Sequence, residues 1–135
     1  MTELAILQIL KGTTNVSAIV GNNISLSYIP QNATPPMVLL TIESNEKAAT
    51  KDGDRREDLT INVQSIAEDL ASGLVLDQKI FNVIHHYNQI SPTTLSSGEV
   101  ININHSYQLT TRSEWNEEIN YHVIISTYRV LSDIS

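Results

Sequence analysis

The chain has 135 residues with 15 acidic and 8 basic side chains, which gives a net charge of −7. This length predicts one domain over residues 1–135, and the negative charge argues against tight nucleic-acid binding, which depends on clustered lysine and arginine. The absence of cysteine excludes disulfides, thiolate metal sites and cysteine nucleophiles, and no apolar run approaches the roughly 20 residues that span a bilayer.

The first predicted elements are helical. Apolar side chains recur every three or four positions over residues 3–11, with Thr2 placed to cap a helix and Gly12 placed to stop it. The segment carries an acidic residue where a secretory signal would carry basic ones, so we expect a helix and no signal. Residues 14–20 predict a second short helical turn that ends at Gly21, because glycine tolerates left-handed backbone angles.

Three extended segments follow. Residues 24–29 alternate between two faces, residues 37–47 begin apolar on both faces, and residues 58–66 alternate strictly between apolar and polar. We therefore predict a half-buried strand, a central strand and a one-sided strand. Three prolines exclude helix from the corner over residues 28–36, which is interpreted either as a stiff loop or as a specific binding edge.

A long helix and a pair of strands complete the pattern. Residues 68–88 carry a wide apolar stripe, with Ser65 or Asp69 as the cap, and residues 100–111 and 120–131 predict two long strands joined by a turn. The order predicts an α+β fold: a mostly antiparallel sheet with one long helix packed on one face and a short N-terminal helix. In the expected core, three side chains of the long helix meet three of the third strand: Leu74, Phe81 and Ile84 on Leu59, Ile61 and Val63.

Few residues suggest catalysis or metal binding. His85 and His86 are adjacent, so on a helix they point about 100° apart and cannot form the i, i+4 pair that zinc helices use. His105 and His122 fall several rungs apart on the final pair of strands. No nucleophile motif or glycine-rich phosphate loop occurs. We expect no enzyme, no cofactor and no metal site, and interpret the histidines as rim or half-buried imidazoles.

Residues 46–58 hold most of the central charge and are predicted to form a polar hairpin loop around a DG turn signal. Their carboxylates resemble a calcium loop only superficially, because basic side chains break up the negative field. Two interpretations stay open: a solvated turn of mixed charge, or an interaction arm that is mobile in the free monomer and ordered on contact. The candidate interface residues of this arm are Lys47, Lys51, Asp52, Asp54, Arg55, Arg56 and Glu57.

Trp115 is the only tryptophan, and it falls in the turn predicted over residues 112–118. A large aromatic side chain in an exposed turn leaves much apolar surface in water, so we expect something to cover it. It is expected either to fold back on its own hairpin or to dock on a neighbouring subunit, and it joins the candidate interface residues.

The succession of these segments resembles the tail-completion, or tail-terminator, proteins of long-tailed phages. The matching segments are SAIVGNNI after the first helix, ISLSYIPQNATPPMVLLTI around the proline corner, LTINVQSIAED in the third strand, AEDLASGLVLDQKI in the long helix, and the final strands. The resemblance covers nearly the whole chain and lies in the order of the segments. The long polar strand over residues 100–111 and the length of the 46–58 loop depart from the common pattern.

The resemblance implies a structural virion protein, assembled in the host cytoplasm, that caps the finished tail tube at its head-proximal end. Its partners would be copies of itself in a six-membered ring, the tail tube protein and the head-connector or stopper protein, with no membrane. DNA would pass through without tight binding, and six copies at −7 each would carry −42, which suits a channel that must not hold its DNA.

Within such a ring the proline corner would be a stiff element that holds the second strand in register while the 46–58 hairpin reaches a neighbour or the tube. The alternative function comes from another class: a small ligand-binding or enzymatic α+β domain. Its pocket would lie between the long helix and the sheet.

Overall fold

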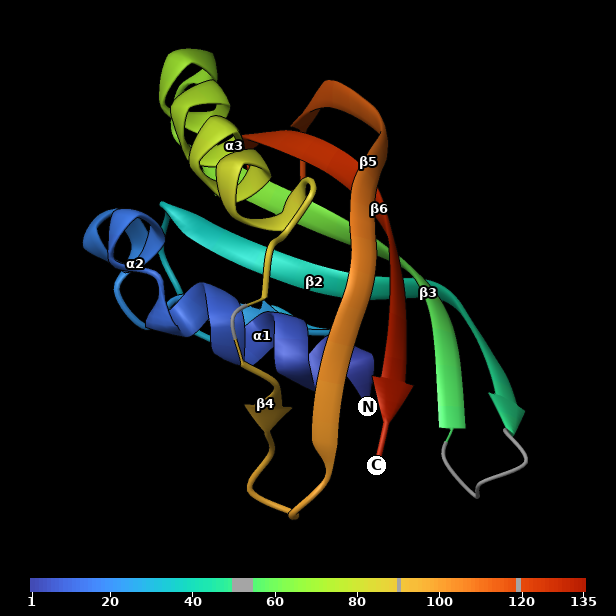
Figure 1. The fold of residues 1–135 in the computed structure, drawn as a ribbon. Helices are drawn as coiled ribbons and strands as arrows, with labels where there is room; N and C mark the ends of the chain where they lie inside the picture. Colours follow the sequence, from blue (N-terminus) through green and yellow to red (C-terminus); the bar gives the residue numbers. More distant parts are fainter. Residues whose placement is uncertain (50–54, 90, 119) are drawn as a thin grey trace.

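The structure is a computed structural model that describes residues 1–49, 55–89, 91–118 and 120–135, and a curled six-stranded sheet organises it (Figure 1). The strands lie in the order β1 (Ile24–Leu26), β2 (Met37–Ala49), β3 (Arg55–Ala67), β6 (Tyr121–Ile134), β5 (Val100–Asn116) and β4 (Thr93–Thr94). Neighbouring strands are antiparallel, except that β1 runs parallel to β2. The structure therefore has the expected α+β fold with a mostly antiparallel sheet.

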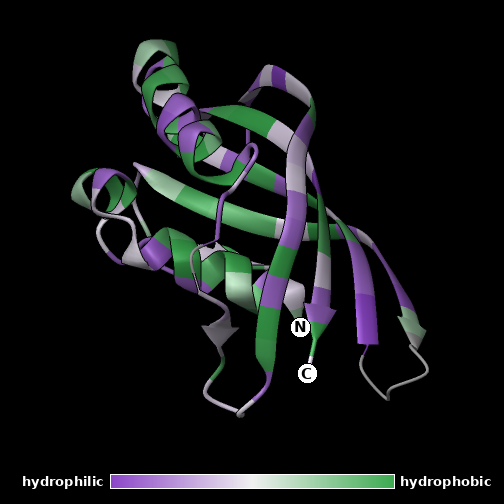
Figure 2. Cartoon of the chain, in the orientation of Figure 1, coloured by the Kyte–Doolittle hydropathy of each residue, from purple (hydrophilic) through white to green (hydrophobic). Residues whose placement is uncertain are grey.

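Three helices cover one face of this sheet: α1 (Thr2–Gly12), α2 (Thr14–Val20) and α3 (Leu70–Ile84). The main core lies between them and the strands, where Leu59, Ile61 and Val63 of β3 are each 0% exposed. Figure 2 shows the corresponding alternation of apolar and polar residues along the strands. Among the described residues, no helix combines the length and the apolar character needed to cross a membrane.

The face of α3 that meets the sheet differs from the predicted one. The helix residues that it buries are Gly73, Leu76, Ile80 and Ile84. The prediction was correct for Ile84 but wrong for Leu74, which is 49% exposed, and Phe81 is only partly buried at the edge of the core. The physical reason lies at Gly73, where an added Cβ would stand 3.3 Å from Ile124 Cγ1. Because Gly73, which has no side chain, is the residue of this turn that faces Ile124, the next residue, Leu74, is turned outward.

The helix ends confirm two of the predicted signals and correct a third. Asp69 caps α3, since its carboxylate accepts a hydrogen bond from the Ser72 backbone N–H, and α2 ends at Gly21 with a φ of 60°. Thr2, in contrast, does not cap α1. It is the first residue of that helix, its side chain is buried, and its hydroxyl donates to Glu57.

The proline corner covers a second, smaller core on the opposite face of the sheet. This core consists of Met37, Leu39, Ile66, Val123 and Ile125. Alternate residues of β2 point to opposite faces, so this core lies across the sheet from Val38 and Leu40. Ala33 from the corner and Tyr121 pack against it.

The corner also returns the chain to the start of the sheet, so that β2 pairs parallel to β1, with Ile24 opposite Val38. These contacts give the stiff loop a packing role.

Two predicted connections are shorter than expected because the strands run further. The β2–β3 ladder continues to the pair Ala49 and Arg55, so most of the predicted 46–58 loop is strand. Only residues 50–54 lie between these strands, outside the described residues. The β5–β6 ladder likewise continues to Asn116 and Tyr121, so the turn predicted over residues 112–118 begins too early. Both segments are polar because consecutive side chains at these ladder ends are exposed, so the one-sided alternation typical of a strand is missing from the sequence there.

Candidate functional site

Part of the candidate interface lies together at the paired ends of β2 and β3. The residues placed there are Lys47, Arg55, Arg56 and Glu57, while Lys51, Asp52 and Asp54 lie outside the described residues. The antiparallel register explains this grouping, since Lys47 stands opposite Glu57 and Arg55 opposite Ala49. We call this region the hairpin end of the sheet.

Trp115 lies at the other end of the sheet. Along β6, Arg55 pairs with Ile134 and Trp115 pairs with His122, so the two sites are separated by twelve residues of strand, or roughly 40 Å at strand spacing. Figure 1 shows the ends of β2 and β3 far from the β5–β6 connection. Trp115 meets the His122 ring edge-on at 4.8 Å and stays 48% exposed. The tryptophan folds back on its own hairpin. It lies at the opposite end of the sheet from the charged residues of the hairpin end.

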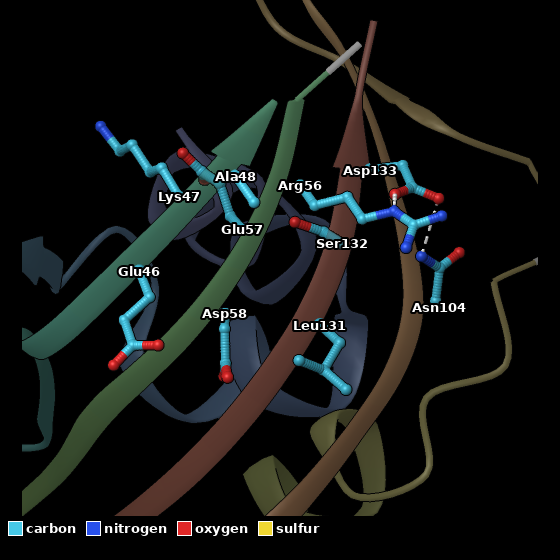
Figure 3. A pocket seen from close by; sticks show the side chains of 10 residues that line it. All are labelled: Glu46, Lys47, Ala48, Arg56, Glu57, Asp58, Asn104, Leu131, Ser132 and Asp133. Atoms are coloured by element: carbon cyan, nitrogen blue, oxygen red, sulfur yellow. Dashed lines mark hydrogen bonds and ion pairs between the residues drawn. The ribbon is translucent and has the colours of Figure 1, made fainter. Parts of the chain in front are cut away.

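A hollow of about 490 Å³ opens at the hairpin end, lined mostly by polar side chains of β2, β3, β5 and β6 (Figure 3). On its outer side, the Arg56 Nε lies 3.2 Å from Asp133 Oδ1. Asn104 donates to the other Asp133 oxygen at 2.9 Å. The Arg56 side chain is 70% exposed, and exposed pairs of this kind contribute about 0–1 kcal/mol. Arg56 is therefore held in place weakly and remains accessible to a partner.

A second charged group crosses the same face beside the hollow. Arg129 donates to both oxygens of Asp58, at 2.9 and 2.6 Å, and to the Tyr107 hydroxyl at 3.1 Å. These hydrogen bonds from Arg129 hold the pKa of Asp58 below its ordinary value. The sequence does not reveal Arg129 and Tyr107 as part of this group, because they lie beside Asp58 only through the register of β6 with the distant strand β3 and with β5.

Glu57 belongs to the interior of the fold rather than to the surface. Its side chain points to the helical face of the sheet, is 2% exposed, and accepts hydrogen bonds from the Thr2 backbone N–H at 2.9 Å and the Thr2 hydroxyl at 2.6 Å. Burial alone would raise the pKa of Glu57, but the Thr2 hydrogen bonds, the Met1 amino group and the Asn45 amide together lower it. This carboxylate caps α1 from a distant strand.

The hairpin end combines charged pairs with exposed basic side chains. Arg56 pairs with Asp133 and Arg129 with Asp58, and the exposed basic side chains lie on two paired strands. Across the part of the chain that the structure describes, no group of three histidine or acidic side chains is placed to hold a metal ion.

Comparison with known proteins identifies a fold relative. No protein family model matches the sequence, and no curated protein matches it. Among solved structures, a chain of "Virion of native gene transfer agent (GTA) particle" superposes with a TM-score of 0.67 at 18% sequence identity. The alignment covers 95% of this chain and 91% of that chain. The two chains therefore share one fold over nearly their whole lengths.

Proposed function

We propose that this chain is a structural protein of a phage-like virion that closes the tail tube at its head-proximal end. In this proposal six copies form a ring, one face meets the tube, the other meets the head connector, and DNA passes through the centre. The observation that carries the proposal is the fold shared with a chain of a gene transfer agent virion over 95% of the present chain. The order of sequence segments that resembles tail-terminator proteins supports the position within the particle.

The surface supports a structural role in two ways. The net charge of −7 favours repulsion of DNA over retention in a channel. The hairpin end offers Lys47, Arg55 and Arg56 on paired strands, where charge complementarity with a partner would set the register between subunits. Ring assembly needs neither a cofactor nor catalysis.

The alternative of a ligand-binding or enzymatic domain is less well supported. It requires a pocket between α3 and the sheet, and the side chains there are tightly packed. Leu76, Ile80 and Ile84 are 0–1% exposed and join the main core directly. A small molecule could enter this interface only by displacing them.

Genetic complementation tests the proposal. A stop codon in this gene should yield full heads and separate tails that do not join, and the intact gene supplied from a plasmid should restore joined, infectious particles. As a matched control, a plasmid copy with the same stop codon should restore none. Normal particles from the stop-codon genome would overturn the proposal, because a required joint cannot be dispensable.

A further inference from the structure

A row of aromatic rings runs from the C-terminal end of α3 onto β5. Phe81 stacks on His85 with ring centroids 4.4 Å apart, His85 lies 4.0 Å from His86, and His86 lies 5.6 Å from His105. His105 in turn lies 5.1 Å from Tyr107. Three imidazoles thus gather where the long helix meets the sheet, although the sequence separates His105 from the other two.

Hydrogen bonds hold this end of the helix on β5. The His86 and Tyr87 backbone N–H groups donate to the Ser106 carbonyl and hydroxyl, at 2.7 and 3.1 Å, and the Ser106 hydroxyl donates to the Ile84 carbonyl. The Gln108 backbone N–H donates to His85 Nδ1 at 3.0 Å. The register of β5 against β6 shifts on both sides of this segment, between 103 and 105 and between 108 and 110.

The contact between Gln108 and His85 depends on protonation. An imidazole nitrogen accepts a hydrogen bond only while it carries no proton, and both nitrogens become donors in the charged ring. A proton on Nδ1 would therefore set two donors against each other at 3.0 Å. It would also place a positive charge beside the rings of His86 and His105.

We propose that the His85–Gln108 contact at the α3–β5 junction is a proton-sensitive latch: it is closed while His85 Nδ1 accepts from the Gln108 backbone N–H, and protonation of His85 breaks this contact and frees the Gln108 amide. The groups that face His85 are His86 from its own segment and His105 from β5. Tyr107 follows along β5, where its hydroxyl accepts from Arg129 of β6, itself paired with Asp58 of β3. Within the described residues, no carboxylate forms an ion pair with the three imidazoles.

The electrostatics give the direction of the switch. Burial, followed by the charges of His86 and His105, lowers the pKa of His85 below its ordinary value of 6.5. A group whose folded pKa is lowered in this way binds its proton more readily in the unfolded chain. The stability that neutral His85 contributes is therefore present above pH 6.5 and is lost as the pH falls below that value. Mild acid should open the latch.

Hydrogen exchange at the Gln108 amide tests the latch in the intact chain. After correction for intrinsic exchange, its protection should fall at least about tenfold between about pH 7.5 and about pH 5. The His85→Asn variant should keep the protection nearly constant over that range, because the Asn oxygen can accept at the Nδ1 position but does not titrate. The matched control is His122→Gln, which removes a histidine at the other end of the sheet and should leave the pH dependence unchanged.

A second measurement needs no variant. Nitrogen NMR of the wild-type side chain should find His85 with its proton on Nε2 at neutral pH, and the chemical shifts of Gln108 should follow the titration of His85. Gln108 protection that does not change with pH, or a His85 proton on Nδ1 at neutral pH, would overturn the proposal. Equal loss of pH dependence in the His122→Gln variant would also overturn it.

Discussion

At the scale of single residues, Glu57 shows that its position on a strand decides whether a charged side chain lies on the surface or in the interior. In sequence it stands in a run of mixed charges, and a surface role is the natural interpretation. In the fold it lies on the helical face of β3, where it accepts hydrogen bonds from the Thr2 backbone N–H and from the Thr2 hydroxyl. The first N–H groups of a helix have no intrahelical partner, so a carboxylate near them is favourable. Nothing in the local sequence of α1 indicates this distant cap.

The Glu57→Ala variant should lower the free energy of unfolding by about 1–3 kcal/mol, because it leaves the buried Thr2 backbone N–H without its acceptor, whereas the Thr2 hydroxyl keeps its contact with Ser132. Since the pKa of Glu57 is lowered in the fold, its contribution is present above its ordinary value of 4.5 and is lost as the pH falls through the folded pKa. Urea melts at neutral and acidic pH measure both effects. The control Glu46→Ala, at an exposed position, should change stability by less than about 0.5 kcal/mol. Equal effects of the two substitutions would contradict the capping role.

Asp77 has the opposite pH behaviour. It is half-buried on α3 with its Oδ1 2.6 Å from Ser126 Oγ, and burial raises its pKa although the Ser126 hydrogen bond lowers it. A raised folded pKa means that stability is present below the ordinary value of 3.8 and is lost as the pH rises through the folded pKa. Asp77→Asn keeps an acceptor for Ser126 and should gain stability over the wild type as the pH rises in paired melts. A constant difference across pH would contradict this assignment.

At the scale of elements, α3 shows what its sequence could and could not predict. The existence of the helix, its apolar stripe and its Asp69 cap follow from local chemistry, and so do the alternating strand over 58–66 and the stop at Gly21. Its orientation does not follow, because the close approach at Gly73 depends on Ile124, far along the chain. The parallel pairing of β1 and the lengths of both hairpins also depend on partner strands.

The candidate site likewise has features that local sequence predicts and features that depend on partner strands. The sequence predicted the charges of the hairpin end, and its exposed members Lys47, Arg55 and Arg56 do lie at one end of the sheet. It could not separate Arg56, which points to solvent, from the adjacent Glu57, because one residue of strand reverses the direction of the side chain. It also grouped Trp115 with residues at the opposite end of the sheet, since distance along paired strands is set by register.

The loss of unfolding free energy on truncating a side chain of α3 should increase with the burial of that side chain. Ile80→Ala, at a side chain that is 0% exposed, should cost about 2–5 kcal/mol of unfolding free energy. Phe81→Ala should cost less than Ile80→Ala because Phe81 lies at the edge of the core, and Leu74→Ala should cost less than about 0.5 kcal/mol. Reversible chemical denaturation of the three variants checks the order. A larger loss for Leu74→Ala than for Ile80→Ala would mean that the helix is rotated.

At the scale of the whole molecule, the proposed ring predicts that a substitution at the interface can impair assembly without changing the stability of the fold. Arg55→Glu combined with Arg56→Glu should leave the melting temperature nearly unchanged, because exposed charges contribute little to folding. The same variant should reduce assembly in the complementation assay, because like charges across an interface cost several kcal/mol. Lys11→Glu with Lys79→Glu is a control with the same change in net charge on the helices. Normal particle yields with the Arg55 and Arg56 variant would remove the hairpin end from the proposed interface.

The central claim is that this chain forms the joint at the head-proximal end of a phage-like tail. Cryo-electron microscopy of intact particles, with the chain identified by fitting its six-stranded sheet and α3 into density, tests it most directly. We expect six copies in a ring between the tail tube and the head connector, with the hairpin end of each copy against a neighbour or the tube. Density for this fold at another place in the particle, or none in purified infectious particles, would contradict it.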